Sequence, residues 1–105
     1  MEFEINDSKW NIIEITNESM EKLFGRDEDE YIHGMTRYSE NIIYIHNSSP
    51  ERERTLKHEL MHVWLYVNGH NQCNKDFDNE DICEIVASSN NFINKIIKEY
   101  FEKGE

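Results

Sequence analysis

The chain has 105 residues, with 11 Lys and Arg against 22 Asp and Glu, which gives a formal net charge of −11 at pH 7. That length predicts a single domain over residues 1–105 with a modest core. The acidic balance argues against nucleic acid or an anionic membrane surface as partner, because both are bound through clustered Lys and Arg. With only two cysteines, no apolar leader and no apolar run of about 20 residues, the sequence predicts a cytoplasmic protein.

The first half of the chain is predicted to form strands around one short helix. Residues 9–15 (KWNIIEI) are rich in Ile and favour a strand, and residues 18–24 can form the helix. Residues 30–38 and 41–46 carry β-branched and aromatic side chains typical of strands. Ser39–Glu40 between them predicts a tight hairpin.

The second half is predicted to form two helices. The first begins at Ser49–Pro50, runs to about residue 67 and stops at Gly69. The second begins at Asp78 or Asn79, either a good cap, and runs to about residue 101. Each helix has apolar residues that are expected to face the core. They are Leu56, Leu60, Val63 and Val67 in the first helix, and Ile82, Ile85, Val86, Phe92, Ile93, Ile96 and Ile97 in the second. Together these elements predict an α+β domain with a short antiparallel β-sheet followed by two helices packed face to face.

Residues 58–62 read H-E-L-M-H and would lie on the first of these helices. Side chains four residues apart stand one turn above the other, so His58 and His62 can reach one cation. Glu59 would point beside that cation toward a bound water, where it can act as general base in attack on a peptide carbonyl. A catalytic Zn²⁺ normally takes three protein ligands and one water, so the motif predicts a zinc site that needs one more ligand.

The first turn of the last helix offers that ligand. Residues 79–84 read N-E-D-I-C-E, and Glu80 or Glu84 can supply the carboxylate. A glutamate that is not itself a ligand can accept a proton from the far nitrogen of a metal-bound histidine. The metzincin arrangement is excluded, because Leu65 and Asn68 stand where that class has Gly and His.

This constellation resembles the gluzincin metallopeptidases. In size it is more similar to the small ImmA/IrrE-type zinc metallopeptidases of phages and mobile elements. The segment TLKHELMHVWL resembles the first half of that family's pattern. Glu80, Cys83, Val86 and Ala87 match the spacing of the second half, and the match covers about residues 42–87. The SprT-like peptidases are a second resemblance, although the chain lacks their Cys-rich zinc ribbon.

The resemblance implies a minimal zincin-like fold and a specific role for each site residue. His58, His62 and Glu80 would bind zinc, Glu59 would catalyse, and Glu84 would orient His58. Glu84 stands where that family has Asn or Asp, so it remains a competitor for the metal. A transcriptional repressor of the helix-turn-helix type is the protein substrate that the resemblance implies.

Two further features would serve such an enzyme. Tyr66, four residues beyond His62, is the easiest donor to place near the oxyanion of the tetrahedral intermediate, and the other candidates are Tyr38, His33, His46 and Tyr100. If residues 41–46 form an edge strand beside the metal, they can bind an extended substrate by strand addition.

The sequence therefore predicts a zinc metalloendopeptidase that acts on an intracellular protein or peptide. The alternative is a non-catalytic, zinc-containing protein-binding module that acts like an antirepressor, by complex formation. A third hypothesis is a closed structural zinc site, for which His70 or Cys73 would supply the fourth ligand.

Overall fold

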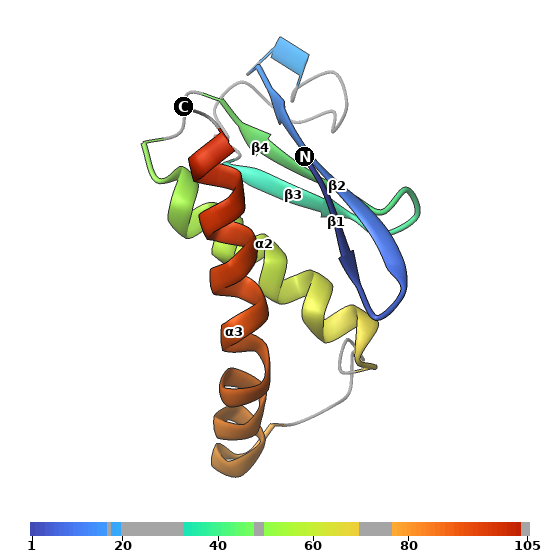
Figure 1. Cartoon of the computed structure of the whole chain (residues 1–105), viewed down its shortest axis with the longest axis vertical. Coiled ribbons are helices and arrows are strands. Elements are labelled where there is room, and N and C mark those ends of the chain that lie inside the picture. The colour runs from blue at the N-terminus through green and yellow to red at the C-terminus, as the bar shows by residue number, and fades with distance from the viewer. Residues whose placement is uncertain (17, 20–32, 48–49, 70–76, 104–105) are drawn as a thin grey trace.

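The computed structural model describes residues 1–16, 18–19, 33–47, 50–69 and 77–103. It is a mixed α+β fold with a four-stranded sheet and two long helices (Figure 1). The elements are β1 (Glu2–Ile5), β2 (Ser8–Ile15), β3 (Gly34–Arg37), β4 (Ile42–His46), α2 (Arg52–Val67) and α3 (Asn79–Lys103). Of the short helix predicted at residues 18–24, only residues 18–19 are described, and both are helical.

The sheet has the order β1-β2-β4-β3 and is mixed. β1 pairs with β2, and β3 with β4, in antiparallel fashion, whereas β2 and β4 are parallel. The prediction of an antiparallel sheet is therefore wrong at its centre. A parallel pair needs a connection of a dozen residues or more, and residues 16–41 provide one between β2 and β4.

The first hairpin was not predicted. Asn6 and Asp7 both adopt positive φ angles, 47° and 66°, between β1 and β2. Two consecutive residues of that conformation form the turn whose twist suits a two-residue hairpin. The alternating letters of EFEI before Asn6–Asp7 are the signal that could have revealed it.

β4 lies inside the sheet, so the prediction that residues 41–46 form an edge strand is wrong. Ile43 and Ile45 are fully buried, and Tyr44 and His46 are nearly so, as expected of a strand covered on both faces. β1 and β3 are the two edge strands of the described sheet, and β3, which is only half-buried, is the one beside β4. The predicted turn between them is confirmed, with Asn41 at a φ of 55°.

α2 begins at Arg52, two residues later than predicted, and the expected cap Ser49 lies outside the described residues. Its predicted end is confirmed. Gly69 has a φ of 77°, and its N–H donates to the carbonyl of Tyr66 at 3.2 Å. A glycine in this left-handed conformation is a common helix stop.

α3 begins with a reciprocal cap. The N–H of Asp81 donates to Oδ1 of Asp78 at 2.8 Å, and the N–H of Asp78 donates to Oδ2 of Asp81 at 3.2 Å. The prediction of Asp78 as cap is confirmed, because each carboxylate satisfies an amide that the helix leaves without a partner.

α3 crosses α2, and its first turns extend beyond α2 (Figure 1). Ile96 and Ile97 are buried, as predicted. Ile82 and Val86, by contrast, are 50% and 56% exposed, so the prediction that they dock α3 is wrong. Periodicity marks one apolar face along the whole helix, but α2 covers only part of its length.

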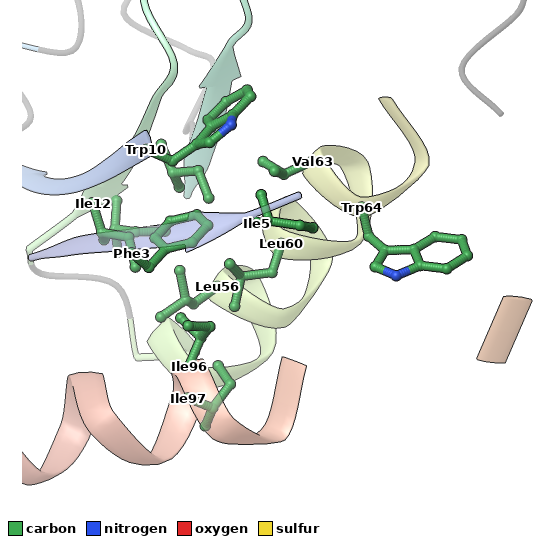
Figure 2. Close-up of a cluster of buried hydrophobic side chains, with 12 residues drawn as sticks. Phe3, Ile5, Trp10, Ile12, Leu56, Leu60, Val63, Trp64, Ile96 and Ile97 are labelled. Atoms are coloured by element: carbon green, nitrogen blue, oxygen red, sulfur yellow. The ribbon is translucent and has the colours of Figure 1, made fainter. Parts of the chain in front are cut away.

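The core lies between the sheet and the two helices (Figure 2). It consists of Phe3, Ile5, Trp10, Ile12, Ile43, Ile45, Leu56, Leu60, Val63, Trp64, Ile96 and Ile97. The α2 stripe is thus confirmed, with Val67 packed against its rim. Within the described part of the chain, neither helix has the length and apolarity that crossing a membrane requires.

Candidate metal centre

α2 presents His58, Glu59 and His62 as one group. Their ligand atoms all lie within 4.8 Å of one another. The buried stripe that includes Leu56 and Leu60 faces the sheet, and a helix turns by about 100° per residue, so positions 58 and 62 fall on the other side. His58 is exposed, His62 is half-buried and Glu59 is buried.

The two imidazoles fit a zinc ion. Nε2 of His58 and Nε2 of His62 are 3.2 Å apart, and the rings meet at 75°. Tetrahedral zinc with Zn–N bonds of about 2.0–2.1 Å holds two ligand nitrogens about 3.3 Å apart. Without metal, one neutral ring can donate a hydrogen bond to the other across the same gap. The spacing therefore suits either a shared proton or a shared cation.

Glu59 is held from the sheet side by Thr36 on β3. The single proton of the Thr36 hydroxyl can be donated to Oε2 of Glu59 at 3.4 Å or to the main-chain carbonyl of Glu59 at 3.5 Å, both long for a hydroxyl donor. Burial raises the pKa of Glu59, while His62, His58 and the bond from Thr36 act in the opposite direction. A carboxylate with increased proton affinity is suited to take a proton from water near neutral pH.

A cleft of about 230 Å³ runs between the start of β3 and α2, and His33, Gly34, Thr55, His58 and Glu59 are among the residues that line it. Gly34 allows the start of β3 to lie close to Thr55 on α2. A Cβ at that position would lie 2.7 Å from Cγ2 of Thr55, inside the contact distance. Of the predicted oxyanion donors, His33 is thus the one that shares a cleft with His58 and Glu59.

Tyr66 and Tyr38 form a stacked pair farther along α2. Their ring centroids are 4.7 Å apart with the ring planes tilted by 38°, and both rings meet Trp10 edge-on. Burial raises the pKa of Tyr38, with a smaller contribution from the charge of Glu59. Tyr66 is 45% exposed and does not line the cleft between β3 and α2.

The two remaining oxyanion candidates lie elsewhere. His46 is 2% exposed within β4. The hydroxyl of Tyr100 donates to Oε1 of Glu14, a carboxylate that also pairs with Arg52 at 2.7 Å. Neither side chain belongs to the His58–Glu59–His62 group.

Neither predicted glutamate joins that group among the described residues. Glu80 and Glu84 are exposed. Glu84 accepts a hydrogen bond from Ser88 at 3.1 Å and lines a cavity with Trp64, which His58 does not line.

The α3 residues that line a cavity together with His58 are instead Val86, Ser89, Asn90, Ile93 and Asn94, and that cavity has a volume of about 380 Å³. The hydroxyl of Ser89 donates to Sδ of Met61 at 3.6 Å, which marks the point where the two helices touch. With Ser89 opposite Met61, Glu80 lies about two and a half turns of α3 before the residue that meets α2.

Sequence reasoning missed Thr36, for which no signal beyond its place in an expected strand exists. His70 and Cys73, the predicted ligands of a closed site, lie outside the described residues.

No family model, curated protein or solved structure matches the chain. The chemistry of the site therefore has to be inferred from its own residues.

Proposed function

We propose that the protein is a zinc-dependent metalloendopeptidase of minimal zincin-like architecture that hydrolyses peptide bonds of an intracellular protein. The observation that carries this proposal is the pair of Nε2 atoms 3.2 Å apart with a buried carboxylate beside them. Two imidazoles at this spacing can bind a cation, and burial raises the pKa of the adjacent carboxylate of Glu59, which favours its use as a general base.

Each residue has a defined task in this proposal. His58 and His62 bind zinc, which when bound lowers the pKa of a coordinated water and polarises the substrate carbonyl. Glu59 accepts a proton from the attacking water and returns it to the leaving amine. Thr36 holds Oε2 of Glu59, so the carboxylate keeps its orientation between these two transfers.

Glu80 remains the third ligand in the proposal. Its carboxylate is exposed, and the first turns of α3 extend beyond α2 with Ile82 half-exposed. Glu84 is the competing ligand, and its bond to Ser88 is an i, i+4 contact on an exposed face.

The substrate would lie along β3. This strand occupies the sheet edge in the described part of the chain, and its first residue lines the cleft with His58 and Glu59. An extended segment can add to such an edge through main-chain hydrogen bonds. His33, in the same cleft, is the donor we propose for the oxyanion in place of Tyr66. The resemblance to ImmA/IrrE-type peptidases favours a transcriptional repressor as substrate.

Zinc content and cleavage of a fluorogenic peptide library, measured on the same preparations, test the proposal. Glu59→Gln should keep its zinc and lose at least about 100-fold in kcat/KM, because general base catalysis contributes about that much. His62→Ala and Glu80→Ala should lose zinc. Glu102→Gln removes a charge far from the site and should leave zinc content and cleavage unchanged.

Three outcomes would change the proposal. Zinc retained in Glu80→Ala but lost in Glu84→Ala would exchange the two glutamates. A wild-type protein that binds zinc, cleaves nothing and still captures its partner would establish the antirepressor-like binding module. If the wild type bound no zinc, both functions would be wrong.

A further inference from the structure

A second cavity lies where the end of α2 meets the beginning of α3. It has a volume of about 310 Å³, and none of the three residues of the metal group lines it. Its size is at the lower end of the range for small-ligand sites, roughly 300–1,000 Å³. It is therefore separate from the His58–Glu59–His62 group, and the only residue it shares with the proposed zinc site is Glu84, the competing ligand.

Aromatic rings form part of the wall of this cavity. Trp64 contributes from α2 and Phe77 from the residues before α3. Figure 2 shows the Trp64 ring pointing away from the other labelled side chains, toward the side where α3 begins. Trp64 as a whole residue is 9% exposed, so most of its surface already contacts the rest of the protein. Aromatic faces attract cations, most strongly when the cation is partly removed from water.

Two carboxylates complete the wall, from Asp81 and Glu84 on successive turns of α3. Both accept hydrogen bonds from neutral donors, Asp81 from the N–H of Asp78 and Glu84 from the hydroxyl of Ser88. Neither forms a salt bridge with any Lys or Arg that the structure describes. The cap of α3 accounts for a carboxylate at Asp81. Glu84 lies beyond the first turn of α3, so the helix dipole stabilises its negative charge only slightly.

We propose that this cavity binds a guanidinium group. A planar guanidinium can stack on the Trp64 ring while its N–H groups donate to the carboxylates of Asp81 and Glu84, which an ammonium cannot do in the same way. Asn68 and Ser88 add neutral polar atoms to the same wall. The formal net charge of −11 also favours basic partners at long range. The guanidinium can belong to an arginine of a partner protein or to a small free guanidine, and both sources share this chemistry.

The test uses the full chain and two matched probes, N-acetyl-arginine amide and N-acetyl-citrulline amide. Citrulline has nearly the same shape but no charge. Titration followed by NMR should show saturable shifts of the Trp64 indole N–H with the arginine probe, and binding at least about tenfold weaker with the citrulline probe. Equal affinity for the two probes, or no saturable shift up to millimolar concentration, would overturn the proposal.

Two double variants separate this cavity from the general acidity of the chain. Asp81→Asn with Glu84→Gln should weaken binding of the arginine probe by about tenfold or more. Glu99→Gln with Glu102→Gln removes the same charge from the other end of α3, and it should change the affinity by less than about twofold. All four positions lie at exposed or half-exposed sites, so the fold should persist. Equal weakening in both double variants would mean that the probe senses only net charge.

Agmatine and a blocked Gly-Arg-Gly peptide distinguish the two sources of guanidinium. If the peptide binds at least as tightly as agmatine, the cavity accepts an arginine with main chain on both sides, as on a partner protein. If only agmatine binds, the ligand is a free guanidine. Failure of both would contradict the proposal, whatever the zinc and cleavage measurements show.

Discussion

Gly34 brings β3 against α2 at the point where the cleft beside His58 begins. A Cβ there would lie 2.7 Å from Cγ2 of Thr55 and 3.0 Å from the carbonyl oxygen of Tyr44. We expect Gly34→Ala to lower the free energy of unfolding by about 1–3 kcal/mol, the usual range for overpacking. Urea unfolding monitored by circular dichroism measures this change.

The control for Gly34 is a second glycine with open space around it. Gly69 has a φ of 77° and no atom within 4 Å of a built Cβ, so Gly69→Ala strains the backbone without a steric clash. Adding Thr55→Ser removes Cγ2 and should restore part of the stability lost in Gly34→Ala, but none of that lost in Gly69→Ala. Equal recovery in both would show that Thr55 is not the obstacle.

Tyr100 links α3 to β2 through Glu14. Burial raises the pKa of Tyr100 well above its ordinary value, as do its hydrogen bond to Glu14 and the charge of that carboxylate, while Arg52 opposes the shift. The protonated hydroxyl is therefore the form that stabilises the fold. Its contribution is complete below the unfolded pKa of about 10 and is lost as the pH rises above that value.

We expect Tyr100→Phe to lower the stability by about 1 kcal/mol at pH 7, the typical net worth of one hydrogen bond. The difference between wild type and variant should shrink above pH ~10, because ionisation of Tyr100 then stabilises the unfolded wild-type chain while the folded state keeps the hydroxyl protonated. Urea unfolding at neutral and alkaline pH measures it. A difference that stays constant, or grows with pH, would contradict the assigned role of the hydroxyl.

At the scale of elements, α3 is one continuous helix with two unequal halves. Its apolar periodicity is unbroken from Ile82 to Ile97, yet Ile96 is 4% exposed and Ile82 is 50% exposed. The sequence pattern predicts which face of a helix is apolar. It cannot predict how much of that face a neighbour covers, because coverage depends on where α2 ends and how the helices cross.

Matched truncations test this division of α3. Ile96→Ala should cost about 2–4 kcal/mol of stability, as deletions in a packed core do. Ile82→Ala should remain within about 0.5 kcal/mol of wild type, as is usual for exposed sites. Urea unfolding of both variants measures the contrast. A large loss in Ile82→Ala would mean that the first turns of α3 are packed more closely than the structure has them.

The strands show the same division between local and non-local information. Residues 9–15 and 41–46 were recognisable from their composition, and the turn before Asn41 from its residue types. The pairing of these strands could not be predicted from composition, because β2 and β4 pair in parallel and are separated in the sequence by residues 16–41. Local propensity carries no information about that partner, and the family resemblance placed β4 wrongly at the edge.

At the scale of the whole molecule, a bound metal would join α2 to whatever supplies the third ligand. Binding to the folded state alone raises stability by RT ln(1 + [L]/Kd), about 2.7 kcal/mol at a hundredfold excess over Kd. We expect zinc to raise the Tm of the metal-free protein and a chelator to reverse the rise. Differential scanning fluorimetry with and without zinc measures this shift.

Two variants on α2 make the zinc experiment specific. His62→Ala should abolish the rise in Tm, whereas Lys57→Ala, a neighbouring exposed change that removes no ligand, should preserve it. Glu80→Ala should reduce the rise if α3 contributes the third ligand. The same rise in His62→Ala as in wild type would show that zinc binds elsewhere on this acidic chain.

The sequence by itself determined the local features: the helical spacing of His58, Glu59 and His62, the cap at Asp78 and the stop at Gly69. Each depends on residues within a few positions of one another, where backbone geometry is nearly independent of the rest of the fold. Only the tertiary structure decided that β3 is an edge strand, that Thr36 lies within hydrogen-bond distance of Glu59, and that Val86 and Asn90, not Glu80, line a cavity with His58. These depend on the crossing of α2 and α3 and on a parallel pairing, which arise from core packing between distant segments.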